Sequence, residues 1–254
     1  MDKKEFKIAI FIPAYNAATT LPMVLDRIPK DVKDRVKEIF VIDNASPDNT
    51  YFVGIGYREE NGLSNLKVFR NETNRGYGGS QKRAYQYAID KGFDAVVMLH
   101  GDAQYAPEKI ATLLEPIEKG EADMVFGSRI AGDPLAGGMP YHRYVGNLFL
   151  TWVENKILDM NLTEFHSGFR VFSCEALKKV PFQLCADDYH FDTDIIIQFR
   201  IKGLRIVERP IPTYYGKEKS HVRIFSYGMN VLRSVSEYWL HKRGLRMVEK
   251  FNVV

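Results

Sequence analysis

The chain has 254 residues, which suffice for one large α/β domain or two small ones. Its hydrophobic content of 45% and charged content of 26% are those of an ordinary globular protein, and a formal net charge of +3 is too mild to indicate nucleic-acid binding. The two cysteines, Cys174 and Cys185, have no metal-type spacing and indicate no disulfide framework, so we expect a reducing compartment.

The amino-terminal stretch MDKKEFKIAIFIPAYN carries charges and passes directly into a short apolar run. It lacks the apolar core and the small-residue cleavage site of a signal peptide. No apolar run approaches the roughly 18–20 residues that span a bilayer. We therefore expect a cytoplasmic protein, peripheral at the cytoplasmic face of a membrane where it contacts one.

Apolar runs in the first half of the chain predict strands at 7–13, 36–43, 65–70, 93–99 and 122–128. Helical patterns alternate with them, from an Asn16 cap to about residue 28, near 49–60, at 78–91, and from Pro107 to about 119. This alternation is typical of βαβ units in a Rossmann-like, mostly parallel sheet flanked by helices. Because ligands lie beyond the carboxyl ends of such strands, the polar residues that follow them should converge at one edge of the sheet.

The pattern changes after residue 130, where AGDPLAGGMP predicts a loop rich in glycine and proline. We then expect a helix at 141–159, a strand with an embedded turn at 164–173, a helix at 190–202, a strand at 204–209 and a helical tail at 222–243. No internal repeat or low-complexity tract interrupts the chain, which indicates a single domain.

The second strand ends in VIDNASPDNT, a stretch dense in hydrogen-bond acceptors and turn formers. Asp43 and Asn44 could form an Asx-type turn that leads into a capped helix. A carboxylate at this strand end could equally accept hydrogen bonds from a nucleobase or a ribose. The residues alone leave both interpretations open.

The fourth strand ends in HGDAQ, where Asp102 and Gln104 lie two apart and can point to one side of an extended segment. A carboxylate with an amide oxygen suits a hard divalent cation that keeps several waters and binds a substrate phosphate. The alternative is a strand end that Asp102 simply caps. His100 is either an ordinary structural histidine or a neutral, switchable ligand.

NRGYGGSQKRA (74–84) places three glycines before a helix, where backbone amides can approach an anion. Its spacing is not that of a dinucleotide-binding fingerprint, and a plain glycine-rich turn is the alternative. Arg129, Arg143, Arg170 and the segment GKEKSHVR (216–223) supply cations suited to phosphate, although a solvated surface position would explain any one of them.

As an ordered set, these motifs resemble the family 2 glycosyltransferases with a GT-A fold, and most closely the dolichyl- or polyprenyl-phosphate mannose synthases. The motifs that carry the resemblance span most of residues 8–221: IPAYN, VIDNASPDNT, NRGYGG, GDAQYAPE, GSR, HSGFRVFS and GKEKSH. The resemblance implies a GT-A glycosyltransferase domain over 1–221, followed by a carboxyl-terminal amphipathic helical tail over 222–254.

The resemblance further implies that Asp102 and Gln104 bind the metal, Mg²⁺ or Mn²⁺, and that both act in catalysis together with Arg129. Substrate-binding residues are then expected at Pro13, Ala14, Tyr15, Asp43, Asn44, Gly76, His100, Gly101, Arg143, Glu164, Ser167, Arg170, Ser220 and His221. Two positions depart from the family's pattern: His100 replaces the first aspartate of the metal motif, and Asn44 replaces a second aspartate after Asp43.

The expected activity is the transfer of a sugar, with inversion, from a nucleotide-diphosphate sugar to a membrane polyprenyl phosphate. A phosphate acceptor is already ionised near pH 7 and needs no strong general base, whereas a sugar or lipid hydroxyl acceptor, the alternative, would need one. ADDYHFDTD (186–194) offers such bases, or else forms a solvated loop and helix cap: Asp187, Asp188, Asp192 and Asp194. A non-catalytic nucleotide-sugar-binding protein is the alternative of another class, and the donor (UDP or GDP, and which sugar) stays open.

The tail RIFSYGMNVLRSVSEYWLHKRGLRMVEKF joins an apolar helical face to a basic end. At helical spacing the face contains Ile224, Gly228, Val231, Val235 and Tyr238. We expect this face to pack on the enzyme's own core, on a membrane subunit or on a second copy. The basic end, which contains Lys242, Arg243 and Arg246, suits contact with anionic lipid.

Overall fold

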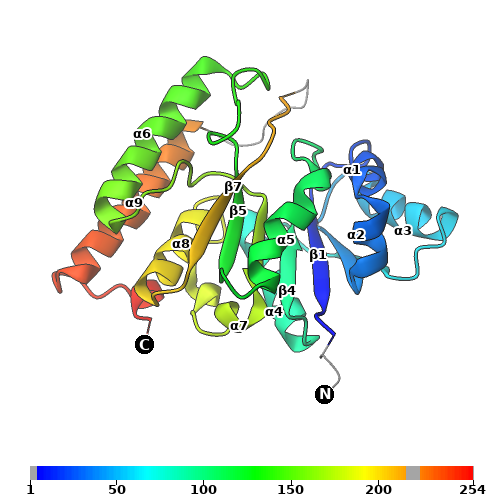
Figure 1. The fold of residues 1–254 in the computed structure, drawn as a ribbon, viewed down its shortest axis with the longest axis horizontal. Coiled ribbons are helices and arrows are strands. Elements are labelled where there is room, and N and C mark those ends of the chain that lie inside the picture. Colours follow the sequence, from blue (N-terminus) through cyan, green and yellow to red (C-terminus); the bar gives the residue numbers. More distant parts are fainter. Residues whose placement is uncertain (1–4, 216–223, 254) are drawn as a thin grey trace.

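A seven-stranded sheet forms the centre of the computed structural model, which describes residues 5–215 and 224–253 (Figure 1). Across these residues the strand order is β3-β2-β1-β4-β6-β5-β7, and every neighbouring pair is parallel except the two that involve β6. The strands are β1 (Ile8–Ala14), β2 (Glu38–Asp43), β3 (Leu66–Arg70), β4 (Ala95–Met98), β5 (Met124–Ser128), β6 (Arg170–Ser173) and β7 (Ile206–Pro210). The predicted mostly parallel α/β architecture is confirmed.

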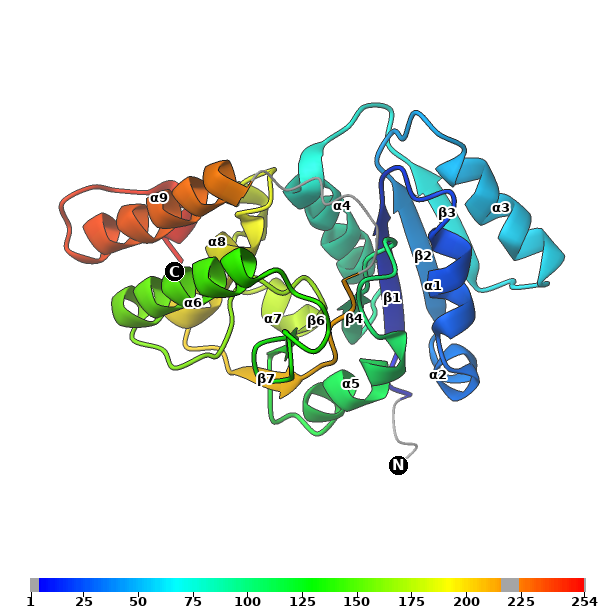
Figure 2. The same ribbon diagram turned by 90° about the horizontal axis from the view of Figure 1, so that it is seen from above.

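Helices cover both faces of this sheet (Figure 2). They are α1 (Leu21–Arg27), α2 (Lys30–Arg35), α3 (Thr50–Glu60), α4 (Gly76–Asp90), α5 (Ile110–Glu118), α6 (Tyr141–Leu158), α7 (Cys174–Leu177), α8 (Phe191–Ile201) and α9 (Ile224–Lys242). Short 3₁₀ turns lie at Pro107–Lys109, Phe182–Leu184 and Glu249–Phe251.

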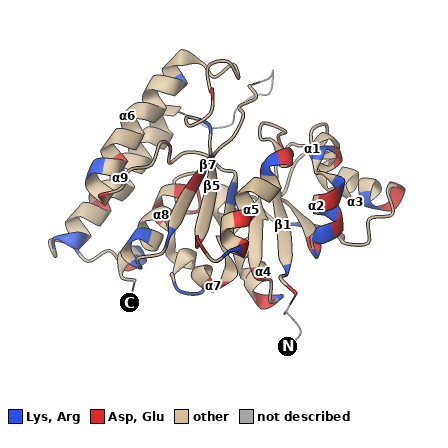
Figure 3. Ribbon diagram, viewed as in Figure 1, with Lys and Arg blue, Asp and Glu red and all other residues tan. Residues whose placement is uncertain are grey.

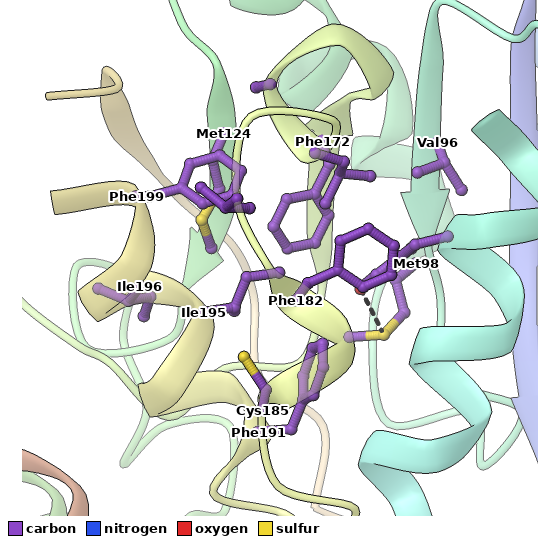
Figure 4. Packing of buried hydrophobic residues seen from close by; sticks show 14 of the residues in the cluster. Val96, Met98, Met124, Phe172, Phe182, Cys185, Phe191, Ile195, Ile196 and Phe199 are labelled. Atoms are coloured by element: carbon purple, nitrogen blue, oxygen red, sulfur yellow. Dashed lines mark hydrogen bonds between the residues drawn. The ribbon is translucent and has the colours of Figure 1, made fainter. Parts of the chain in front are cut away.

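Two hydrophobic clusters hold the layers together, and β1 contributes to both because its side chains alternate between faces. Ile10 and Ile12 pack with α1, α2 and α5, whereas Phe11 packs with α4, α7 and α8. In the second cluster, Phe172 and Phe199 contact each other edge-to-face between β6 and α8 (Figure 4). The core therefore fixes the strand ends relative to helices on both sides.

Two predicted elements differ most from the structure in their extent. The first helix begins at Leu21 rather than after Asn16, which has a φ of 53°. The amides ahead of the helix bind the loop after β2 instead: Asn16 donates to Ser46 Oγ at 3.0 Å and Ala17 to Thr50 Oγ1 at 2.8 Å. The strand predicted at 164–173 is reduced to Arg170–Ser173, because the residues before it form the wall of a cavity.

Helices α6 and α9 lie side by side at one end of the molecule (Figures 1 and 2). On α9, Val231, Val235 and Tyr238 are buried, while Phe225 is 84% exposed. In the described part of the chain, no helix is long and apolar enough to cross a membrane. The division into a domain at 1–221 and a tail at 222–254 stays a prediction.

Candidate active site

A cavity of about 710 Å³ lies at the carboxyl ends of β1, β2, β4 and β5, against the first turns of α6 and α9. The chain enters β1 from the lower edge of the view in Figure 1, so this cavity lies toward the upper edge. Eleven predicted site residues line it: Pro13, Ala14, Tyr15, Asn44, Gly76, His100, Gly101, Asp102, Gln104, Arg129 and Arg143. The topology thus brings together residues that are more than a hundred positions apart.

Four predicted substrate-binding residues are buried outside the cavity lining: Asp43, Glu164, Ser167 and Arg170. Asp43 accepts a hydrogen bond from Ser46 N at 3.0 Å and lies 3.3 Å from Arg70 Nε. Arg170 donates to the carbonyl oxygens of Ser167 and Phe165, each at 2.8 Å. In this structure Asp43 and Arg170 contact partners within the protein, and the substrate-binding role of the four residues stays a prediction. Ser220 and His221 lie outside the described residues.

In the first turn of α4, the amides of Gly78 and Gly79 are not free for an anion. Gly78 N and Gly79 N both donate to the carbonyl oxygen of Asp187, at 2.8 and 3.2 Å. A Cβ at Gly76 or Gly78 would collide with the backbone of residues 186–187. The glycines therefore permit a close approach of two chain segments, which corrects the prediction of an anion cradle.

Asp102 and Gln104 line the cavity together, although the segment between them is a turn rather than an extended strand. Ala103 has a φ of 62°, and Gln104 N donates to Asp102 Oδ1 at 3.1 Å. The carboxylate is 44% exposed. No cluster of three or more His, Cys, Asp or Glu side chains suited to a metal occurs in the described residues, so Asp102 supplies a single carboxylate.

His100 forms part of the cavity wall between two tyrosine rings. Its Nε2 lies 3.1 Å from the hydroxyl of Tyr77, and its ring meets Tyr77 and Tyr105 edge-on. Any side chain at Gly168 would collide with the imidazole. Burial lowers the pKa of His100 below its ordinary value, against the opposing effects of Asp102 and Asp192. The residue that replaces the metal-motif aspartate is therefore an uncharged, enclosed ring near neutral pH.

Arg129 reaches the cavity with its charge already compensated by Glu164. Arg129 Nε donates to Glu164 Oε1 at 2.9 Å, and the Arg129 amide donates to Oε2 at 2.7 Å. Asn147 of α6 adds a third donor at 2.8 Å. Burial alone would raise the pKa of Glu164, but the Arg129 guanidinium and these hydrogen bonds bring it below its ordinary value. The pair is a fixed, buried ion pair.

Arg143 differs from Arg129 because it has no carboxylate partner among the described residues. It lies on the first turn of α6, half-buried, with its guanidinium carbon 5.8 Å from the centre of the Tyr215 ring. On its α6–α9 side the cavity is also lined by Leu150 of α6 and Ile224, the first residue of α9. This end therefore combines a cation that is free to bind an anion with apolar side chains.

The acidic segment 186–194 is only partly the solvated loop that the sequence indicated. Asp187 pairs with Lys82 at 2.7 Å and Asp188 is exposed at the cavity. Asp192 and Asp194, in the first turn of α8, are buried instead. Asp192 lies 3.5 Å from Arg170 and accepts a hydrogen bond from Tyr77, while Asp194 pairs with Lys250 at 2.9 Å.

Five tyrosines of the cavity were not predicted from the sequence. Tyr77 and Tyr189 stack with ring centroids 5.0 Å apart, and Tyr105, Tyr215 and Tyr227 complete the lining. Tyrosine is common in this chain, so its presence in a segment does not indicate a binding site. These five residues also lie in five separate segments of the sequence. The fold, rather than any local motif, brings them together.

Comparisons with known proteins agree on one relationship. A family model described as glycosyl transferase family 2 matches residues 9–181. The chain is 33% identical over 218 residues to the UDP-N-acetylglucosamine–dolichyl-phosphate N-acetylglucosaminyltransferase of Methanococcus voltae, covering 82% of this chain and 86% of that protein. It is 27% identical over 210 residues to the undecaprenyl-phosphate mannosyltransferase of Micrococcus luteus, covering 81% and 82%.

Solved structures give the same result for the fold. Glucosyl-3-phosphoglycerate synthase from Mycobacterium tuberculosis, in complex with Mg²⁺ and uridine diphosphate, superimposes with a TM-score of 0.69 at 19% sequence identity. The match covers 95% of this chain and 80% of that one. At this identity the likeness shows the fold alone.

Proposed function

This chain belongs to glycosyl transferase family 2 and has the predicted GT-A fold, and we propose that it transfers a sugar from a nucleotide-diphosphate sugar to a polyprenyl phosphate. Relatives that match over four fifths of the chain are named as enzymes acting on dolichyl or undecaprenyl phosphate. The cavity at the strand ends provides room for both substrates of such a reaction.

The observation that carries the proposal is the end of the cavity next to α6 and α9. An acceptor of this class is a phosphate attached to a hydrocarbon chain, so its site must offer a cation beside an apolar surface. Arg143 supplies the cation, and Leu150 and Ile224 supply the apolar surface. A small, fully polar acceptor would not require that combination.

The opposite end of the cavity suits the donor. Tyr15, Asn44 and Gly101 follow the carboxyl ends of β1, β2 and β4, where a nucleotide diphosphate would lie. An acceptor phosphate oxygen attacks the anomeric carbon as the bond from that carbon to the diphosphate breaks, which inverts the configuration and releases the nucleoside diphosphate. Because the acceptor is already ionised, the engagement of Asp192 with Arg170 and Tyr77 does not impede the reaction.

A divalent cation, Mg²⁺ or Mn²⁺, fits the residues present. Asp102 is a half-exposed carboxylate on the cavity wall with Gln104 beside it, a donor set typical of a cation that keeps several waters. Asp102 would hold the ion, and the ion would supply neutralising charge to the leaving diphosphate.

The proposal is tested by measuring nucleoside diphosphate release from a panel of UDP and GDP sugars. We expect one donor to release its diphosphate only when a short polyprenyl phosphate is added. Donor binding by calorimetry without release under any acceptor would instead identify a nucleotide-sugar-binding protein.

Replacing Arg143 with alanine should raise the KM for the polyprenyl phosphate about 10- to 100-fold, because a hydrogen-bonded contact with a charged group is lost. The KM for the donor should change little, since Arg143 lies at the other end of the cavity. Lys156→Ala, an exposed cation at the far end of the same helix, is the matched control. An unchanged acceptor KM in Arg143→Ala would remove this residue from the acceptor site.

We also propose that the protein meets its acceptor as a peripheral protein on the cytoplasmic face of the membrane, through the basic end of the tail. Lys242, Arg243 and Arg246 are exposed beyond the buried stripe of α9, and Arg243 lies 4.0 Å from the centre of the Trp239 ring. In Figure 3 the ribbon at the end of α9 has the blue of Lys and Arg. A cationic end beside an aromatic ring suits an anionic lipid surface.

Changing Lys242, Arg243 and Arg246 together to alanine should weaken binding to anionic vesicles by roughly a hundredfold, at about 1 kcal/mol for each basic residue. Liposome co-sedimentation at low salt measures the effect.

The matched control changes Lys30, Lys37 and Lys67 to alanine, which lowers the net charge by the same amount. These residues are exposed on α2, before β2 and on β3, away from α9. Equal sedimentation of the tail variant and the wild type would show that the basic tail is not the docking site.

A further inference from the structure

Three side chains from separate parts of the chain form a polar relay that ends at the cavity. Glu154 Oε2, on α6, lies 3.1 Å from Nε2 of His166 in the loop before β6. Nδ1 of the same ring lies 2.8 Å from the hydroxyl of Tyr227, in the first turn of α9. His166 and Tyr227 both line the cavity. The three groups therefore lie in the order carboxylate, imidazole and phenol, and the phenol is the group next to the cavity.

The buried end of this relay is costly to maintain. Glu154 is fully buried, and the side chain of His166 is only 6% exposed. Glu154 Oε1 accepts a hydrogen bond from Thr193 Oγ1 of α8 at 3.2 Å, whereas Oε2 faces His166 Nε2 at ion-pair distance without forming a hydrogen bond of good geometry. A carboxylate without a polar neighbour would be strongly destabilising in such a place, and the imidazole is the group that faces Oε2.

The hydrogen bond between His166 and Tyr227 determines what the phenol can do. With a proton on Nδ1, the imidazole donates to the Tyr227 oxygen and leaves the phenolic proton free for a ligand in the cavity. Burial raises the pKa of Tyr227 well above its ordinary value, with a further contribution from Glu154, so the phenol remains a donor. An anionic ligand favours this arrangement because the phenolic proton then points toward its charge.

Tyr227 lines the cavity from α9, which packs against α6, the helix that carries Arg143 and Leu150. We propose that Tyr227 hydrogen-bonds to the phosphate of the acceptor, and that Glu154 and His166 are positioning residues that hold its hydroxyl toward that phosphate. This inference rests on the proposed function, since it takes the acceptor to be a polyprenyl phosphate. The phenol supplies a neutral donor beside the Arg143 cation.

The test is Tyr227→Phe, which removes one oxygen, assayed with the full chain, its best nucleotide sugar and a short polyprenyl phosphate. We expect the KM for the acceptor to rise about 10- to 100-fold, while the KM for the donor and the thermal unfolding midpoint stay near those of the wild type. Tyr238→Phe is the matched control, because it makes the same change on the same helix at a residue outside the cavity lining.

Glu154→Gln separates positioning from simple structural support. Alone it should raise the acceptor KM, but added to Tyr227→Phe it should cause little further rise, because both changes act through one hydroxyl. Fully additive effects, or an unchanged acceptor KM in folded Tyr227→Phe, would overturn the inference and leave the proposed function intact. A wild-type protein that transfers sugar to no polyprenyl phosphate would overturn both.

Discussion

Asp102→Ala should reduce sugar transfer by at least about a hundredfold while leaving the protein folded. Asp102 is the carboxylate that faces the cavity beside Gln104, at the end of β4, and it is 44% exposed. Its removal would take away the proposed anchor for a divalent cation, at the point where negative charge would develop on the leaving diphosphate. Steady-state rates with Mg²⁺ and with Mn²⁺, together with the thermal unfolding midpoint, measure both effects.

Asp187→Ala is the matched control for Asp102→Ala. Asp187 is also an exposed aspartate near the cavity, but its carboxylate pairs with Lys82 on the surface and does not line the cavity. A surface ion pair of this kind contributes little to stability, so the control should behave as the wild type. Near wild-type transfer by Asp102→Ala with either metal would show that the metal site is assigned wrongly.

Arg129→Met should lower the free energy of unfolding by about 3–5 kcal/mol, because it leaves the buried carboxylate of Glu164 without its cation. Glu164 is fully buried, and its remaining donors would be the backbone amide of residue 129 and the side chain of Asn147. Urea denaturation followed by circular dichroism measures the change. Activity should fall as well, because Arg129 lines the cavity and is a predicted catalytic residue.

A double variant separates loss of charge pairing from loss of packing. Arg129→Met with Glu164→Gln removes both charges and keeps a side-chain oxygen that can accept from the amide of residue 129. This protein should be more stable than the single variant Arg129→Met, since no uncompensated charge remains. If the double variant is no more stable, or the single one loses less than about 1 kcal/mol, the buried ion pair does not support the wall.

The order of strands and helices was predictable because each strand is a short apolar run that ends abruptly in polar residues. The predicted bounds of these elements were wrong where tertiary contacts determine them. Asn16 was predicted to cap a helix. The amides of Asn16 and Ala17 instead donate hydrogen bonds to the hydroxyl oxygens of Ser46 and Thr50, some thirty residues away. The helix and capping propensities of a local stretch cannot predict hydrogen bonds with a loop that is distant in the sequence.

The site was predictable where a single rule applied. Residues at the carboxyl ends of parallel strands share one edge, and this placed Asn44, Asp102 and Arg129 in one cavity. The rule does not predict whether a side chain at a strand end reaches the cavity or is buried in the protein. Asp43 and Arg170 lie next to cavity residues in sequence, but their side chains turn into the protein and bind Arg70 and backbone carbonyls.

Contacts between distant segments had no sequence signal. Glu154, His166 and Tyr227 lie on a helix, a loop and the tail, and their alignment depends on α6 and α9 packing side by side. The sequence left the glycines of 74–84 open as an anion cradle or a plain turn, because the segment that fills their space, residues 186–187, is a hundred positions away. Such features require the fold before they can be recognised.

The central claim, transfer to a phosphate rather than to a hydroxyl, is tested most directly by comparing a short polyprenyl phosphate with the matching polyprenol. The full chain is incubated with each acceptor and the nucleotide sugar that it binds, and the products are analysed by mass spectrometry and phosphorus NMR. We expect a product only from the polyprenyl phosphate, with a new bond between the anomeric carbon of the sugar and a phosphate oxygen of the acceptor. Glycosylation of the polyprenol, or an unmodified polyprenyl phosphate after complete turnover of another acceptor, would contradict it.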